Sequence, residues 1–268
     1  MIEFEILVRG VYRPAQLLLT YDSSLRLEVS ATTRQWMDAF WKQAQAQNSR
    51  LFDAPLYRYI AAHAQPDGSL SLTLGDTSYK EYVVTRNEAY AQGKERAQFG
   101  NPLAVCSVVE TADGFLLLDK REGVDVYVGR YHVIGGFFER DLDGGAKPDP
   151  FAAMRREIRE ETGITVDDIS EQLCLGLVYD LRVPHAELCF LTRLHISLAE
   201  VCQRKPEDNE IQQLRTLQVD SEALRTFIIQ NHGNISATGE PNLLFYGAWK
   251  FGDAWFDEVY RRIKEGAA

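Results

Sequence analysis

The amino-acid sequence predicts a protein of the α+β or α/β class, in which a mixed β-sheet is sandwiched between helices and a smaller α+β lobe precedes it. Three observations support this fold class. Aliphatic runs of strand length alternate with amphipathic stretches of helical period. Two Asp-Gly dipeptides mark tight hairpin turns. In the second part of the chain, the predicted order is a hairpin, a strand, a helix, further strands and a helix, which favours one mixed sheet covered by helices.

Length and charge limit the kind of protein. With 268 residues, the chain is long enough for one large or two modest domains. The formal net charge of −10 argues against a nucleic-acid partner, because phosphate backbones bind to basic surfaces. A small phosphorylated molecule remains compatible with this charge, since a bound cation can invert the local field.

Membrane and secretory segments are not expected. No apolar run approaches the roughly 20 residues that cross a bilayer, and the start of the sequence has neither the basic nor the apolar part of a signal peptide. The four cysteines stand far apart, which favours reduced thiols over disulfides or a zinc site. We therefore expect a cytoplasmic protein without a membrane partner.

The N-terminal lobe is predicted to span residues 1–100. Short strands within residues 2–30 precede a helix that begins behind Ser30 or Thr32 as its N-cap. Four large apolar side chains recur in this helix at helical spacing and are expected to pack in the core, namely Trp36, Met37, Phe40 and Trp41.

A hairpin and a second helix complete this lobe. The Asp-Gly dipeptide at residues 67–68 is a strong turn signal between two strands. A polar helix is expected over residues 87–98. The Gly-Asn-Pro stretch at residues 100–102 then marks the boundary to a second domain at residues 101–268.

The second domain is expected to contain the mixed sheet. An apolar strand at residues 103–111 turns through the Asp-Gly dipeptide at 113–114 into a second strand. A third strand ends in paired glycines, Gly135 and Gly136. Beyond a central helix, three strand-like runs precede a helix over residues 220–232.

The central helix has clear ends. Asp149 is a good N-cap, Pro150 suits the first helical position, and Gly163 supplies a left-handed stop. An apolar stripe at i, i+3 and i+7 is expected to anchor the helix on the sheet, and it consists of Phe151, Met154 and Ile158.

Three carboxylates gather on another face of this helix. Glu157, Glu160 and Glu161 stand at i, i+3 and i+4, so they lie within about one turn and repel one another. One interpretation is a solvated helix surface that neighbouring arginines neutralise. The other is a site for a hard cation such as Mg²⁺ or Mn²⁺, which prefers oxygen ligands.

The helix and the glycines before it form an ordered motif. Seven positions in one stretch carry it, namely Arg156, Glu157, Ile158, Glu160, Glu161, Gly163 and Ile164, and Gly136 stands upstream behind Gly135. These positions resemble the motif of the Nudix hydrolases, G-x5-E-x7-R-E-U-x-E-E-x-G-U, in which U is aliphatic. The resemblance implies the Nudix fold, a divalent metal, and hydrolysis of a nucleoside diphosphate linked to another group.

The first half of the motif departs from this pattern. The leading glycine stands 20 positions before Arg156, whereas the motif has 14, so about six residues are inserted. We expect the insertion to be a surface loop, because its Gly-Gly and Pro residues break regular structure. The motif's early glutamate would fall at Pro148, which cannot bind a metal. Asp141, Asp143 or Asp149 could replace it, although Asp149 is more economically interpreted as the helix cap.

A finer resemblance lies outside the motif, over residues 50–140. It is carried by the stretches LFDAPLYRY, LGDTSYKEYVVTRN and PLAVCSVVETADGFLLLDKR. They are similar to the UDP-glucose/UDP-galactose pyrophosphatase branch of the Nudix proteins, in which a lobe of about this size also precedes the Nudix domain. This resemblance implies a UDP-sugar as the substrate.

The Nudix resemblance also implies roles for the motif residues. Glu157 and Glu161 would be the principal Mg²⁺ (or Mn²⁺) ligands, and Glu160 would complete a catalytic site for a further ion. The backbone carbonyl of Gly135 would be a further metal ligand. Arg156 would orient a glutamate through a charge-assisted hydrogen bond.

A general base is expected from a downstream loop. Glu207 and Glu210 stand before the next strand, and Glu210 is favoured; a solvated loop acid is the alternative for both. Glu187 either faces the metal site and the substrate or is an outward strand residue. His185 is expected to be a polar hairpin residue rather than a substrate contact.

Substrate choice is expected to lie with the N-terminal lobe. Tyr79 and Lys80 stand on or near a strand end, where they could stack on a base and meet a phosphate. Asp53 and Tyr57 could join them. The alternative is that these aromatic side chains fill the core of the lobe or its interface with the second domain.

The sequence therefore predicts a Mg²⁺-dependent pyrophosphatase that converts UDP-glucose or UDP-galactose to UMP and sugar 1-phosphate. Hydrolysis of ADP-ribose or of another nucleoside diphosphate derivative is the second enzymatic hypothesis. The third is a regulator of Nudix fold that binds a nucleotide without hydrolysing it. Loss of the helix glutamates would indicate such a regulator, and here all three are present.

Overall fold

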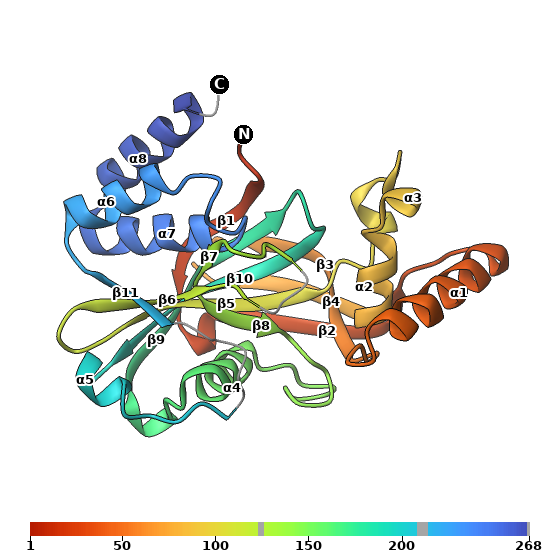
Figure 1. Ribbon diagram of the computed structural model, residues 1–268, viewed down its shortest axis with the longest axis horizontal. Coiled ribbons are helices and arrows are strands. Elements are labelled where there is room, and N and C mark those ends of the chain that lie inside the picture. The colour runs from red at the N-terminus through yellow and green to blue at the C-terminus, as the bar shows by residue number, and fades with distance from the viewer. Residues whose placement is uncertain (123–125, 208–213, 267–268) are drawn as a thin grey trace.

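The larger sheet of the protein is the mixed sheet that the sequence predicted (Figure 1). The computed structural model describes residues 1–122, 126–207 and 214–266. The strands of this sheet are β1 (Phe4–Tyr12), β5 (Leu103–Glu110), β6 (Phe115–Lys120), β7 (Tyr131–His132), β8 (Ile134–Phe137), β9 (Ile169–Asp180), β10 (His185–Leu194) and β11 (Leu214–Gln218). They follow the order β1-β9-β10-β5-β6-β11, with β7 paired to β6 and β8 to β5. Only the pair of β10 and β5 is parallel among the described strands of this sheet.

Helices cover both faces of this sheet, which confirms the predicted fold class (Figure 1). One face carries α4 (Pro150–Thr162), and the other carries α6 (Ser221–Gln230), α7 (Gly239–Phe251) and α8 (Asp253–Gly266). Strand β5 is buried along its whole length. Val105 and Val109 pack in the core on the α4 side, whereas Cys106 and Val108 pack in the core formed with the C-terminal helices. A strand covered on both faces is apolar at successive positions, because both sets of side chains lose contact with water.

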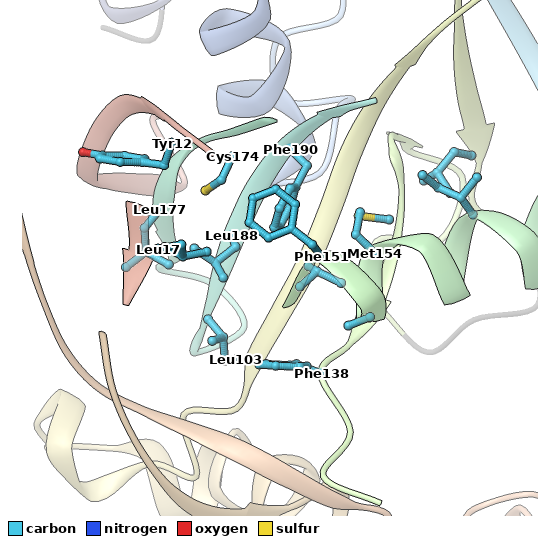
Figure 2. Packing of buried hydrophobic residues seen from close by; sticks show 14 of the residues in the cluster. Tyr12, Leu17, Leu103, Phe138, Phe151, Met154, Cys174, Leu177, Leu188 and Phe190 are labelled. Atoms are coloured by element: carbon cyan, nitrogen blue, oxygen red, sulfur yellow. The ribbon is translucent and has the colours of Figure 1, made fainter. Parts of the chain in front are cut away.

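The apolar stripe of α4 anchors this helix on the sheet as predicted. Phe151, Met154 and Ile158 are all buried. Figure 2 shows Phe151 and Met154 beside Phe190 of β10, and the rings of Phe151 and Phe190 meet edge-on with centroids 5.0 Å apart. This packing fixes which way the opposite face of the helix points.

A second sheet is formed by the N-terminal part of the chain. Its order is β2 (Leu17–Arg26), β4 (Leu70–Ser78) and β3 (Pro55–Ala64), and α1 (Ala31–Gln47) and α2 (Tyr79–Thr85) accompany it (Figure 1). The predicted hairpin between β3 and β4 is confirmed, and Gly68 in its turn has a φ of +80°. The predicted cap of α1 is confirmed as well, since the Ser30 hydroxyl accepts the Thr33 N–H. Met37 and Trp41 are buried, but Trp36 is 37% exposed, so the prediction that it packs in the core was wrong.

Two expectations about helices need correction. The polar helix predicted over residues 87–98 is only the four-residue helix α3 (Glu88–Ala91) and a 3₁₀ turn at Arg96–Gln98. Gly93, with a φ of +71°, separates them. The helices α7 and α8 were not predicted. In α7 the first nine residues are buried, polar ones included, so the segment carries no simple amphipathic stripe.

Several contacts join the N-terminal part of the chain to the larger sheet. Strand β1 is itself an edge strand of that sheet, paired antiparallel with β9. Strand β3 touches the segment after β8, where the Tyr57 N–H donates to the Phe138 carbonyl at 3.2 Å. The division of the chain at about residue 100 stays a prediction, and β1 lies across it. Within the described residues, no helix is long and apolar enough to cross a membrane.

Replacing Gly176 by alanine should weaken the attachment of β1. Gly176 has a φ of +151°, and a Cβ atom there would lie 2.3 Å from the Val8 carbonyl oxygen on β1. We expect Gly176→Ala to lower the free energy of unfolding by about 2–4 kcal/mol in urea titrations. Gly114→Ala is the control, because Gly114 also has a positive φ (+80°) but has no atom within 4 Å of the added Cβ, and should cost about 1 kcal/mol. Equal losses in the two variants would contradict the role assigned to this close contact.

Candidate active site

The helix that carries the motif has the ends that the sequence predicted. The Asp149 carboxylate accepts the N–H groups of Phe151 and Ala152, both at 3.0 Å. Gly163 ends the helix with a φ of +73°, and a side chain there would collide with the backbone of Lys205. The three helix glutamates are therefore presented from a rigid element with a fixed orientation.

Arg156 is held by an aspartate of the inserted segment. Its Nε donates to Asp143 Oδ1 at 2.9 Å and its Nη2 to Asp143 Oδ2 at 2.8 Å, which is a bidentate pair. Nη2 also donates to the Phe137 carbonyl at 3.0 Å. Of the three aspartates that could replace the missing motif glutamate, Asp143 is the one that contacts Arg156, while Asp149 is the helix cap.

The insertion is anchored at Asp143 and is not a plain surface loop as expected. Asp143 is only 3% exposed, although most of its neighbours in the segment are exposed. Its N–H donates to the Glu139 carbonyl at 2.9 Å, and its carboxylate accepts the Glu139 N–H at 2.9 Å. Tyr57 of β3 donates its hydroxyl to the Gly145 carbonyl at 2.6 Å. Deleting six residues here would therefore remove the partner of Arg156.

One nitrogen of Arg156 bridges two of the helix carboxylates. Nη1 lies 2.9 Å from Glu157 Oε1 and 2.9 Å from Glu160 Oε2. Burial alone would lower the pKa of Arg156, but the hydrogen bonds to Asp143 and the charges of Glu157 and Glu160 raise it above its ordinary value. Burial raises the pKa of Glu157 to about 8, against the opposing effect of Arg156. Glu157 is therefore a buried carboxylate that a single arginine compensates incompletely.

The paired glycines are required by close approach. A Cβ atom on Gly136 would lie 2.6 Å from the Glu157 carboxyl group, and one on Gly135 would lie 2.3 Å from the Val105 carbonyl oxygen. No larger residue fits at either place without displacement. The backbone of β8 therefore lies directly beside the Glu157 carboxylate.

These residues fit a hard divalent cation. The donors are all oxygens, and Glu157 and Glu160 already share one positive nitrogen. Glu161 is on the same helix and is buried (8% exposed). In the part of the chain that the structure describes, no three His, Cys, Asp or Glu side chains converge on one point as a preformed metal site. A bound cation would instead take up oxygens that Arg156 now draws toward itself.

A pocket of about 430 Å³ lies beside the helix carboxylates. Its lining includes eight of the residues singled out in the sequence, namely Tyr79, Gly135, Gly136, Arg156, Glu157, Glu160, His185 and Glu187. Glu161 does not line this pocket among the described residues. The volume of the pocket is within the range of small-molecule binding sites.

Aromatic rings form one wall of this pocket. Tyr79 and Tyr82 of α2 both meet the Phe137 ring edge-on, with centroids 5.8 and 5.1 Å away. Tyr79 also packs edge-on against Trp41 at 6.2 Å. The two interpretations of Tyr79 therefore both apply, because its ring lines the pocket and also packs against α1. Phe52, at the same pocket, is 66% exposed.

The other suggested substrate contacts of the N-terminal part are engaged elsewhere. Tyr57 is fully buried, so it belongs to the core. Lys80 Nζ contacts Asp38 at 2.5 Å, and the Lys80 N–H donates to the Asp53 carboxylate at 2.9 Å. These contacts give Lys80 and Asp53 a structural role at the start of α2.

Glu187 faces inward and is therefore not an outward strand residue; its role toward a metal or a substrate stays a prediction. It is 2% exposed and lines the pocket from β10. His185 also lies at the pocket as the first residue of β10, and its Nε2 is 3.3 Å from Glu187 Oε2. Burial favours a lower pKa for His185, but the hydrogen bond to Glu187 and the nearby Asp180 raise the pKa above its ordinary value. His185 thus forms a buried polar pair with Glu187 and is not merely a polar hairpin residue.

Of the two candidate general bases, Glu207 belongs to the part of the chain that the structure describes. Glu207 is half-exposed and pairs with Arg159, with 2.9 Å between Oε1 and Nε. Its N–H donates to the Glu160 carbonyl at 2.9 Å, so this loop passes the end of α4. Glu210, the favoured base, lies outside the described residues.

Several pocket residues were not found from the sequence. His132 of β7 and Ser236 and Thr238, just before α7, line the pocket together with Glu187. Arg50, Phe52 and Arg121 line it as well. Phe52 and Arg121 lie in stretches that carry the resemblance to the UDP-glucose/UDP-galactose pyrophosphatase branch, but nothing in those stretches marks them as pocket residues. The other four residues belong to none of the motifs named above.

Comparison with known proteins identifies relatives of the chain. No protein-family model matches it. It is similar to uridine diphosphate glucose pyrophosphatase NUDT22 of Mus musculus, with 28% identity over 166 residues that cover 52% of this chain and 54% of the mouse protein. The Homo sapiens protein of the same name is 29% identical over 167 residues, covering 52% of this chain and 55% of its own. The chain therefore spans about half the length of the curated relatives it matches.

Solved structures give weaker likenesses. A Nudix hydrolase from Nitrosomonas europaea is 17% identical and has a TM-score of 0.41, covering 56% of this chain and 90% of its own. A bifunctional NMN adenylyltransferase/ADP ribose pyrophosphatase from Francisella tularensis, complexed with AMP and a Mn ion, is 13% identical with a TM-score of 0.41 and covers 64% of this chain and 47% of its own. The sequence relatives confirm the resemblance to the UDP-glucose pyrophosphatase branch of the Nudix proteins.

Removing the Asp143 carboxylate should destabilise the site more than removing its neighbour. Asp143→Ala leaves the buried Arg156 without its bidentate partner, so we expect a loss of about 3 kcal/mol in the free energy of unfolding. Asp141→Ala is the matched control; Asp141 is exposed, and its loss should change this free energy by less than about 0.5 kcal/mol. Calorimetric unfolding of both variants measures the difference. If both variants are as stable as the unmodified protein, Asp143 does not anchor Arg156.

Proposed function

We propose that this relative of the uridine diphosphate glucose pyrophosphatases is a divalent-metal-dependent hydrolase that cleaves the pyrophosphate of a UDP-sugar, giving UMP and a sugar 1-phosphate. The observation that carries the proposal is the arrangement around α4. Glu157 and Glu160 share Arg156 and line a pocket of suitable volume beside the paired glycines of β8. The named activity of the relatives supports the choice of substrate.

The acids of α4 would supply the negative charge that holds the metal ions needed for the reaction. Glu157 and Glu161 would hold Mg²⁺ together with the Gly135 carbonyl, and Glu160 would serve a further ion. When bound, the metal neutralises the pyrophosphate oxygens and lowers the pKa of the attacking water. Asp143 holds the guanidinium of Arg156 in place, and Arg156 in turn fixes the positions of Glu157 and Glu160. Glu210 is proposed as the base that accepts the proton of the water.

The remaining pocket residues would hold the two ends of the substrate. Tyr79 and the exposed ring of Phe52 offer flat apolar surfaces on which a base can stack, an interaction worth roughly 1–3 kcal/mol per base. Arg50 and Arg121 line the same pocket and bring positive charge that favours a phosphate. The N-terminal part of the chain would then bind the nucleotide, and α4 would provide the catalytic residues, in the same cavity.

The experiment that tests this function is hydrolysis of a nucleotide panel. UDP-glucose, UDP-galactose, ADP-ribose, CDP-glucose and GDP-mannose are incubated with the protein and Mg²⁺, and the products are separated by chromatography. We expect UMP and sugar 1-phosphate from the two UDP-sugars, and no product when EDTA removes the metal. Hydrolysis of ADP-ribose in preference to the UDP-sugars would show a different substrate. Tight nucleotide binding without any product would indicate a regulator instead.

Glu161→Gln should abolish turnover without unfolding the protein. The change keeps the volume of the side chain but removes a charged oxygen ligand, so we expect kcat to fall at least a hundredfold. Glu222→Gln on α6 is the control, because this exposed helix acid lies in a different helix and should leave kcat unchanged. Both proteins are checked by circular dichroism. Full turnover by folded Glu161→Gln would remove Glu161 from the metal site.

A further inference from the structure

A buried polar cluster lies at the pocket beside the helix carboxylates. It consists of His132, His185, Glu187, Ser236 and Thr238, all of which are at least 90% buried and all of which line the pocket. The reaction proposed above assigns no task to His132 or to the serine and threonine. Three elements supply the cluster, namely β7, β10 and the segment before α7.

The hydrogen bonds of His185 define its charge and that of Glu187. His185 Nδ1 is 2.6 Å from the Val183 carbonyl and Nε2 is 3.3 Å from Glu187 Oε2, and both partners can only accept. Both ring nitrogens of His185 therefore carry protons. Glu187 is the anion that compensates this imidazolium. The Thr238 hydroxyl and the Cys106 thiol also hydrogen-bond to its carboxylate, whose two oxygens together can accept about four hydrogen bonds, so acceptor capacity remains.

The tautomer of His132 follows from Ser236. The Ser236 hydroxyl accepts the Gly239 N–H at 3.0 Å, so its own proton can go to His132 Nδ1, 2.6 Å away. Nδ1 then accepts, and the proton of the neutral ring is on Nε2. Burial, helped by Arg121, lowers the pKa of His132 to about 3, which agrees with a neutral ring.

The two groups of the cluster that remain available to a ligand are a donor, His132 Nε2–H, and an acceptor, Glu187 Oε1. His132 Nε2 and Glu187 Oε1 are 4.0 Å apart, which is too far for a hydrogen bond between them. One hydroxyl oxygen can lie at about 2.8 Å from each, accepting from Nε2–H and donating to Oε1. A phosphate oxygen does not fit, because it has no proton for Oε1 and would meet the charge of Glu187.

We propose that His132 and Glu187 bind a hydroxyl group of the sugar in the nucleotide-sugar substrate, and so select a hydroxylated group on the far side of the pyrophosphate. This inference rests on the proposed function. The position of the pair supports it. The His185 ring is edge-on to Phe137 with centroids 6.4 Å apart, and Phe137 follows Gly136, which lies against Glu157. A sugar next to the cleaved phosphate would therefore lie within reach of the pair.

The imide edge of uracil also offers one acceptor and one donor. The two rings proposed above to stack on a base, Tyr79 and Phe52, however, belong to the N-terminal part of the chain, whereas His132 and Glu187 belong to the larger sheet. The sugar hydroxyl is therefore the preferred ligand, and uracil becomes an outcome of the test.

The experiment compares UDP-glucose with its four monodeoxy analogues, 2-, 3-, 4- and 6-deoxy, in the unmodified protein and in His132→Phe. We expect loss of one particular hydroxyl to lower kcat/KM about 10- to 100-fold in the unmodified protein. In His132→Phe, the same loss should change kcat/KM less than threefold, because the partner is already missing. A purely structural role of His132 would lower activity toward all five substrates by the same factor.

Two further variants make the outcome decisive. Ser236→Ala frees the tautomer of His132 without changing the ring, so it should reduce the same hydroxyl penalty if His132→Phe fails to fold. His63→Phe on β3 is the control, because His63 is exposed and does not line the pocket. Equal hydroxyl penalties in all variants would overturn the proposal. A penalty for CDP-glucose that disappears in His132→Phe, with hydroxyl penalties unchanged, would assign the pair to uracil and overturn it as well.

Failure of the proposed function is recognised separately. If the unmodified protein hydrolyses no UDP-sugar, calorimetry measures binding of UDP-glucose and the same analogues in Ca²⁺. A hydroxyl penalty in affinity that His132→Phe removes would then support the sugar site although the hydrolase is wrong. No such penalty in the unmodified protein would overturn the sugar site.

Discussion

The guanidinium of Arg156 holds together three segments on which the whole site depends. It donates to the Phe137 carbonyl at the end of β8, to Asp143 in the insertion and to the carboxylates of α4. A buried cation of this kind is costly unless every donor finds an acceptor, and each of these segments supplies one. The same cation reduces the repulsion among acids that lie within about one turn of helix. Removing Asp143 or the carboxylates of α4 would leave charge uncompensated, and removing the Phe137 carbonyl would leave a buried donor without its acceptor.

The position of the pocket follows from the way the two sheets meet. The larger sheet is covered by helices on both faces, and β3 of the second sheet comes alongside the segment that follows β8. The rings of α2 then stand next to the glycines of β8 and the acids of α4. Segments from both ends of the chain thus contribute to one cavity.

The buried polar cluster of β7, β10 and the segment before α7 forms one wall of the pocket. Hydrogen bonds within this cluster influence where its protons lie. Both partners of His185 are acceptors, which favours a charged ring, and the Ser236 hydroxyl can donate to His132 Nδ1, which favours a neutral one. The hydrogen-bonding capacity of the neighbours thus favours opposite protonation states in the two histidines. Burial makes each state persistent, since changing one would leave a polar atom without a partner.

The sequence by itself determined the central helix, its two ends, its apolar stripe and the cluster of Glu157, Glu160 and Glu161, because these depend on residues fewer than fifteen positions apart. It also determined the need for glycine at the end of β8. Tertiary structure alone decided that Asp143, rather than Asp141 or Asp149, pairs with Arg156, because the path of an insertion depends on packing against β3. It likewise decided that Tyr57 is a core residue and that His132 and Ser236 meet Glu187. Those residues are 49 to 104 positions apart from one another, and only the folded sheet brings them within hydrogen-bonding range or close to it.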